Sequence, residues 1–228
     1  MLGAIAIIPS APVLVPQLAG AAAAEIADLR EAVIAAAAAL PPRWIALGAG
    51  RADSVVGPDN VGTFAGFGVD LPVRLSPGAD RPPGEMPLCA LMTGWVREQA
   101  QPGASAEVRV YAPDHHVDVA LARGRRLRAE IDKDTEPTGV LIVADGATTL
   151  SPAAPGGHNP RDAQVQLALD DALACGDLVA LARLPGQVVG RVPFQVLAGL
   201  AAPAPRSAKE LYRGAPYGVG YFAGIWQP

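Results

Sequence analysis

Short apolar runs separated by helix-like stretches set the pattern of this chain. Residues 3–8, 44–47 and 140–143 are continuous apolar runs without polar alternation, which is typical of strands covered on both faces of a sheet. A fourth strand is predicted at 108–112. Helices are expected between these strands, at residues 21–40, 87–99 and 119–131. The alternation predicts an α/β fold with a mostly parallel or mixed central sheet flanked by helices.

The remaining segments complete this picture. We expect a strand nearer the sheet edge at 71–75 and a glycine-spaced strand at 217–226. Three further helices are predicted, at 163–173, 178–184 and 192–200. Nothing in the 228 residues resembles a linker, so we expect one domain spanning 1–228.

The net charge of the chain limits the classes of binding partner that we expect. The net charge is -4 with a pI near 5.3, and no basic stripe occurs, which argues against nucleic acid and anionic membrane surfaces. The partner can still be a small molecule or a protein, and the chain can still form a homo-oligomer. Cys89 and Cys175 both lie in apolar helical surroundings and are expected to be buried free thiols.

The first 24 residues are uncharged and end in alanines, which could mimic a secretory leader. Pro9, Pro12 and Pro16 interrupt the apolar run, and no Lys or Arg precedes Arg30. Charged residues from Glu25 onward also break the only long apolar segment, so no transmembrane span is expected. We therefore expect a cytoplasmic protein.

The segment that follows the apolar run at 140–143 is the first candidate for the wall of a binding site. Residues 145–160 form a loop rich in Gly, Pro, Ser and Thr, longer than most loops after strands. Ligands in open α/β sheets bind beyond the carboxyl ends of the strands. Asp145 is either a functional carboxylate or a turn residue that bonds backbone N–H groups. Asn159 is a plausible helix cap, with Pro160 at the first helical position.

Known catalytic and binding motifs are absent. The sequence has no nucleophile elbow, P-loop, H-E-x-x-H or paired-cysteine zinc motif. The Gly48-Ala49-Gly50 turn lacks the spacing of a dinucleotide site. His115 and His116 are adjacent, which points their rings apart rather than at one metal, and a hydrogen-bonded or exposed loop role is open for each and for His158.

Six segments, in order, resemble the class III extradiol ring-cleavage dioxygenases. In that family the first strand enters a Pro-His-Pro-Pro-like turn, similar to residues 9–16 (PSAPVLVP). The second strand ends in a Ser-Pro-His-Gly-like turn, which falls on 47–50 (LGAG), and a Gly-Asp-Phe-x-x-Phe-Gly segment resembles 62–68 (GTFAGFG). The other similar segments are 114–116 (DHH), 144–161 (ADGATTLSPAAPGGHNPR) and 216–221 (PYGVGY).

The resemblance implies a dioxygenase-like fold, and in the family ferrous iron is held by histidines on the two early turns and by a later ligand. Here those turns offer Ser10 or Ala11 and Ala49 or Gly50, and the later Ser-His-like position offers Ala147 or Thr148. Alanine and glycine have no donor atom, and hydroxyls are poor ligands for a redox iron. No histidine precedes His115. We therefore expect no metal and no cofactor, where the family would use ferrous iron.

Two functions follow from this comparison. The first is a pseudoenzyme that keeps the fold to bind a small ligand or a partner. Its cleft is expected to contain Ser10, His115, Asp145, Thr148, Thr149 and His158. The second is an active oxidoreductase or hydrolase with a relocated site around Asp145 and His115, for example with metal on these two residues and His158. In either case we expect Asp145 and His115 to face one cleft.

Overall fold

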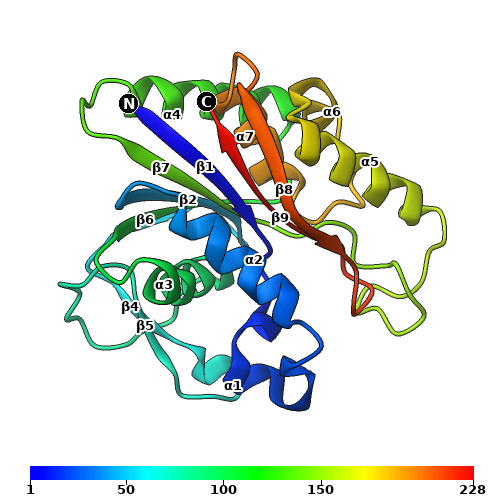
Figure 1. Cartoon of the computed structure of the whole chain (residues 1–228), viewed down its shortest axis with the longest axis horizontal. Coiled ribbons are helices and arrows are strands. Elements are labelled where there is room, and N and C mark those ends of the chain that lie inside the picture. The colour runs from blue at the N-terminus through cyan, green and yellow to red at the C-terminus, as the bar shows by residue number, and fades with distance from the viewer.

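A seven-stranded sheet runs through the middle of the molecule in the computed structural model, which describes residues 1–228 apart from the side chain of Ala21. The strand order is β3-β6-β2-β7-β1-β9-β8 (Figure 1). These strands are β1 (Leu2–Ile8), β2 (Arg43–Ala49), β3 (Ser54–Val56), β6 (Ser105–Tyr111), β7 (Thr138–Val143), β8 (Ser207–Gly214) and β9 (Tyr221–Gln227).

The four central strands are parallel, and the outer strands are antiparallel. β7 lies between β1 and β2, and β6 pairs with the other side of β2, all in parallel register. β3 is an antiparallel edge strand on β6, whereas β9 and β8 continue the sheet beyond β1 in antiparallel pairing. The carboxyl ends of β1, β2, β6 and β7 therefore meet at one edge. This confirms the predicted mixed, mostly parallel sheet.

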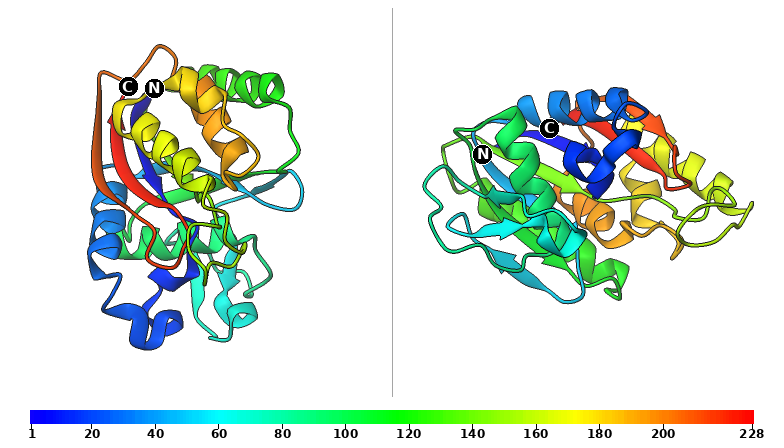
Figure 2. Two further views of the ribbon diagram at one scale, coloured as in Figure 1. Left: turned by 90° about the vertical axis from the view of Figure 1, so that its right-hand side faces the viewer. Right: turned by 90° about the horizontal axis from the view of Figure 1, so that it is seen from below.

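Helices cover both faces of this sheet (Figure 2). α2 and α3 pack on one face, and α4, α5, α6 and α7 pack on the other. The α-helices are α1 (Pro16–Ala19), α2 (Ala27–Ala38), α3 (Leu88–Ala100), α4 (Val117–Ile131), α5 (Asp162–Cys175), α6 (Leu178–Ala182) and α7 (Arg191–Leu200). Short 3₁₀ helices are η1 (Pro12–Leu14), η2 (Gly20–Ala23) and η3 (Phe64–Phe67). The result is the single α/β domain expected from the sequence.

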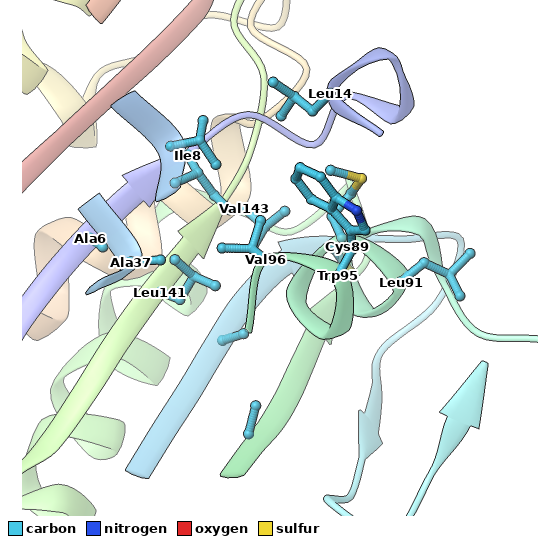
Figure 3. Packing of buried hydrophobic residues seen from close by; sticks show 14 of the residues in the cluster. Ala6, Ile8, Leu14, Ala37, Cys89, Leu91, Trp95, Val96, Leu141 and Val143 are labelled. Carbon is cyan, nitrogen blue, oxygen red and sulfur yellow. The ribbon is translucent and has the colours of Figure 1, made fainter. Parts of the chain in front are cut away.

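The buried strands supply side chains to two cores. Along β1, Ala6 and Ile8 point to the core under α2 and α3, whereas Ile5 and Ile7 point to the core under the other helices. Figure 3 shows the first of these cores, where Cys89 on α3 lies over the strands. A strand with apolar partners on both sides needs no polar positions, which explains the continuous apolar runs.

Several local predictions differ from the structure. The expected strand at 71–75 does not join the central sheet: β5 (Pro72–Arg74) pairs only with β4 (Val61–Thr63) in a two-stranded sheet. The expected strand at 217–226 is shorter, because β9 begins at Tyr221, and its neighbour β8 was not predicted. β8 has no continuous apolar run, as is common for an edge strand that carries charges.

Helix boundaries also differ. The helix expected from residue 21 begins only at Ala27, after 3₁₀ turns and a positive φ of 54° at Gly20. The helix expected from Pro160 begins at Asp162, because Asn159 sits in a turn whose carbonyl accepts the Asp162 N–H. Cys89 is buried as predicted, but Cys175, in the last turn of α5, is exposed. Within the described residues, none of the helices has the length and apolar character required to cross a bilayer.

Candidate functional site

The turns after β1 and β7 are joined by a half-buried carboxylate. The Ser10 N–H donates a hydrogen bond of 2.8 Å to Asp145 Oδ1. Burial raises the pKa of the Asp145 carboxyl to about 6, although the bond from Ser10 opposes the shift. Asp145 therefore lies at the predicted carboxyl edge, and it bonds backbone N–H as a turn residue does. Burial outweighs the hydrogen bond, so the pKa of this carboxyl lies above the ordinary value of an aspartate.

The loop after Asp145 is tied down by its own backbone and by α5. Gly156 N–H donates to the Thr148 carbonyl, and Asn159 N–H donates to the Thr149 carbonyl. The Thr149 hydroxyl bonds the Asp162 carboxylate at 2.5 Å, so this candidate site residue orders the start of α5. His158 is exposed at the tip of the loop. The predicted cleft residues Thr148, Thr149 and His158 thus share one ordered loop.

A buried amide connects the same loop to the helix behind it. The Gln166 side chain is 6% exposed, accepts a bond from Ala147 N–H at 2.8 Å, and donates to Asp170 Oδ1 at 2.8 Å. Burial raises the pKa of the Asp170 carboxyl to about 6. A Cβ at Gly146 or Gly220 would lie 2.0 Å from Gln166 Oε1, so both glycines permit this close approach. Gln166 therefore ties the turn at Ala147 to α5.

His115, after β6, is held by a carboxylate from the turn after β2. Its Nε2 lies 2.7 Å from Asp53 Oδ1, which also accepts the Ala112 N–H at 2.9 Å, and Asp53 Oδ2 pairs with Arg123 at 2.6 Å. Partial burial opposes ionisation, but the Ala112 N–H, His115 and Arg123 outweigh it and lower the pKa of Asp53. The Arg123 guanidinium also lies 5.7 Å from the centre of the Tyr111 ring.

These contacts show which partners Asp145 and His115 have. Asp145 and His115 both follow parallel strands at the carboxyl edge, but they do not bond one another: Asp145 bonds the Ser10 amide, and His115 bonds Asp53. The reason is strand order, because β2 lies between β6 and β7 and its own turn reaches His115 first. The carboxylate–imidazole pair of this edge is therefore Asp53–His115.

An open hollow of about 630 Å³ lies where β2 ends. Its wall includes Ala49, Gly50 and the exposed Arg51. Met86, Leu88 and Val110 form its apolar side. Across the described residues, the Arg51 guanidinium has no hydrogen-bond or ion-pair partner. Glu85 also lines the wall, so the hollow presents a guanidinium and a carboxylate beside apolar surface. Its volume is within the range common for small-molecule sites.

Two glycines at this turn are crowded by neighbouring side chains. A Cβ at Gly48 would lie 2.2 Å from the Cβ of Cys89, and a Cβ at Gly50 would lie 2.4 Å from Val110 Cγ1. Real Cβ atoms do not approach so closely, so neither position accepts a larger side chain without movement. Apolar packing from α3 and β6 thus fills the space beside this turn.

The residues present do not fit the iron centre of the family. Among the described residues, no group of three or more His, Cys, Asp or Glu side chains is arranged to hold a metal ion. The early turn positions carry Ser10, Ala11, Ala49 and Gly50, of which only serine has a side-chain oxygen. A mononuclear ferrous site needs a facial set of nitrogen and carboxylate ligands, and this edge does not assemble one.

Comparisons with known proteins establish the fold alone. No family model and no curated protein matches the chain. The crystal structure of the uncharacterized protein JW3007 from Escherichia coli K12 is similar, with a TM-score of 0.60 and 11% sequence identity. The match covers 99% of this chain and 100% of that one, so the similarity extends over the whole α/β domain.

Three residues of this edge were not predicted from the sequence: Asp53, Arg51 and Gln166. Gln166 had a detectable signal, because Asp162, Gln166 and Asp170 follow one another at a spacing of four and so share one helix face. All three are buried in the structure. Asp53 and Arg51 lie in an irregular turn, where no periodicity marks a residue.

Proposed function

We propose that this chain is a dioxygenase-like protein without an iron centre, and that it binds a small organic ligand in the hollow at the end of β2. The observation that carries the proposal is the turn at Ala49 and Gly50. The resemblance places an iron-binding histidine there, whereas here the turn has no donor side chain and lines an open hollow. A turn that carries no donor side chain and borders an open hollow suits ligand binding better than ring cleavage.

The crowding at Gly48 and Gly50 supports the loss of the metal. Cys89 and Val110 occupy the space that a side chain at these glycines would need. A histidine could be restored there only together with changes in its neighbours. The turn and the side chains packed against it therefore all differ from what an iron site requires. This is expected of a protein in which the metal does not contribute to function.

The lining of the hollow indicates the chemistry of the ligand. Met86, Leu88 and Val110 offer apolar surface, and the free Arg51 guanidinium offers a fork of donors for a carboxylate. We therefore infer a small molecule with an apolar body and an acidic group. A protein partner is the less favoured occupant, because this volume suits a small molecule.

An active enzyme with a site around Asp145 and His115 has weaker support. The two side chains have different partners, so they do not form a joint acid–base pair. Hydrolytic or oxidative chemistry there would need a further group that brings them together. The binding function requires no such rearrangement.

Two measurements test the proposal. The protein is first incubated anaerobically with ferrous iron, desalted, analysed for iron, and assayed with protocatechuate for the yellow ring-fission product. We expect neither stoichiometric iron nor turnover above a free-iron control. Turnover that is abolished by His115→Ala or Asp145→Ala would instead establish a relocated enzyme site.

The second measurement addresses binding. A library of small aromatic and aliphatic acids is screened by ligand-observed NMR against the wild type, Ala52→Phe and Ala153→Phe. Ala52 lines the hollow, whereas Ala153 is an exposed loop residue elsewhere, so the second variant is the matched control. We expect hits that are lost in Ala52→Phe and retained in Ala153→Phe. Hits unaffected by Ala52→Phe would place the ligand outside this hollow.

A further inference from the structure

A second hollow opens on the other face of the sheet, between α4, α6 and α7. It has a volume of about 590 Å³, and its wall includes His115, Arg183, Leu184, Arg191 and Gln195. The hollow at Ala49 is instead bordered by Leu88 of α3, which packs on the opposite face. The two hollows are therefore separate, and the second is not part of the proposed function.

The two arginines of this hollow lack carboxylate partners. Throughout the described residues, Arg183 has no ion pair, and Arg191 bonds only neutral oxygens. Its Nη2 donates to the Pro113 carbonyl at 2.8 Å, and its Nη1 lies 3.4 Å from the His115 carbonyl and 3.5 Å from Gln195 Oε1. Asp114 also lines the hollow but pairs with neither guanidinium. Two guanidinium groups thus line one hollow without an ion-pair partner among the described side chains, and Asp114 is the one carboxylate in its wall.

Other arginines in the neighbourhood are compensated. Arg109 bonds both Glu107 and Glu130, and Arg123 pairs with Asp53. Those side chains line a different hollow, next to β3, where the carboxylates already occupy the guanidinium groups. The absence of such partners at Arg183 and Arg191 therefore distinguishes this hollow from a neutralised arginine cluster.

Arg191 is also fixed in place. Gln195 is 2% exposed, donates to the Ala182 carbonyl at 3.2 Å, and lies against the Arg191 guanidinium through its oxygen. A guanidinium has five N–H donors, and three contacts to protein oxygens leave about two of them for a ligand. A preorganised donor loses less entropy on binding than a free surface arginine.

We propose that this hollow binds a small organic phosphate, with the phosphate between Arg183 and Arg191 and the organic part against Leu184 and Val117. A phosphate has three acceptor oxygens and a charge near -2, so it can accept from both guanidinium groups, whereas a carboxylate has two oxygens and a single charge. Val117 and Leu184 are half-buried members of the same wall and supply the apolar contact.

The test compares phenyl phosphate, inorganic phosphate and benzoate by isothermal titration calorimetry on the full chain. We expect phenyl phosphate to bind tightest, and Arg183→Gln to weaken it about fivefold or more, as loss of one charged hydrogen bond predicts. Arg81→Gln is the matched control, because Arg81 is an exposed arginine that has no ion pair among the described residues and lines neither hollow. It should leave phenyl phosphate binding unchanged.

A second variant, Arg191→Lys, keeps the charge but removes the planar fork, and it should also weaken phenyl phosphate. Thermal unfolding of Arg183→Gln should match the wild type, since Arg183 is exposed. No binding of phenyl phosphate, equal weakening by Arg81→Gln, or benzoate binding that Arg183→Gln weakens as much as phenyl phosphate binding would each overturn the proposal. Equal affinity for inorganic phosphate would contradict the apolar contact.

Discussion

The backbone N–H of Ser10 donates to the carboxylate of Asp145 across 2.8 Å, which joins the turns that follow two adjacent parallel strands. This bond brings together two segments separated by 135 positions in the chain. It also places an acidic group in a desolvated position at the edge of the sheet where ligands bind in related folds. The free energy of unfolding is therefore expected to depend on the protonation state of Asp145.

Asp145→Asn should reduce the pH dependence of stability. The folded-state pKa of Asp145 is raised to about 6 from an ordinary value near 3.8, so the folded state holds an extra proton between these values. Stability therefore falls as pH rises from about 4 to about 6, by about 3 kcal/mol in total for a two-unit shift. Asparagine keeps the acceptor for Ser10 but carries no charge.

Urea unfolding at pH 4.5 and pH 7.5 checks this. We expect Asp145→Asn to lose less stability than the wild type between the two values. Some slope should remain, because burial also raises the pKa of Asp170 to about 6. Asp59→Asn, at an exposed position, is the control and should follow the wild type. An unchanged slope in Asp145→Asn would show that Asp145 is not desolvated.

Gln166→Leu should destabilise the domain by about 2 to 3 kcal/mol. Leucine fills a similar volume but leaves the Ala147 N–H and the Asp170 carboxylate without their partner inside the protein. Chemical denaturation measures the change. Gln164→Leu, on an exposed position of the same helix, should alter stability by no more than about 0.5 kcal/mol. Similar effects for both variants would argue against the buried bridge.

Gly50→Ala should destabilise the protein by about 1 to 3 kcal/mol through overpacking against Val110. Val110→Ala removes the Cγ1 atom that the new methyl group would meet. The double variant should therefore be more stable than the sum of the two single changes predicts, with a coupling of about 1 kcal/mol or more in a double-mutant cycle. Additive effects would mean that the turn relaxes without contacting Val110.

Asp53→Ala should loosen the start of the loop after β6. The carboxylate accepts the Ala112 N–H and holds His115 and Arg123, so its removal frees three donors. We expect hydrogen exchange of the Ala112 amide to become about tenfold faster, which corresponds to about 1.4 kcal/mol of local stability. The Ala106 amide, which bonds the Leu75 carbonyl, is the control. Equal acceleration at both amides would indicate global destabilisation instead.

Much of the fold could be predicted from the sequence because the evidence for it is local. Residues 3–8 and 140–143 are continuous apolar runs, and such runs are stable only where helices cover both faces of a sheet. The β8 edge strand was missed for the same reason: none of its positions is fully buried, and its sequence, SAKELYRG, has no continuous apolar run.

The candidate site was predicted only in part. The position of Asp145 at the sheet edge followed from its place after a strand, and the absence of histidine at the early turns could be seen directly in the chain. The pairing of Asp145 with His115 could not be decided, because it depends on which strands are neighbours. In the structure, Asp53 reaches His115 from 62 positions away, since β2 adjoins β6.

The sequence by itself therefore determined the class of fold, the edge at which the loops gather, and the side chains available there, since each follows from local apolar patterning and residue identity. Only the tertiary structure decided which of those side chains meet. Strand order set the Asp53–His115 and Ser10–Asp145 contacts, and close packing set the crowding at Gly50. Contacts between distant segments depend on the whole arrangement of the sheet, which no local pattern encodes.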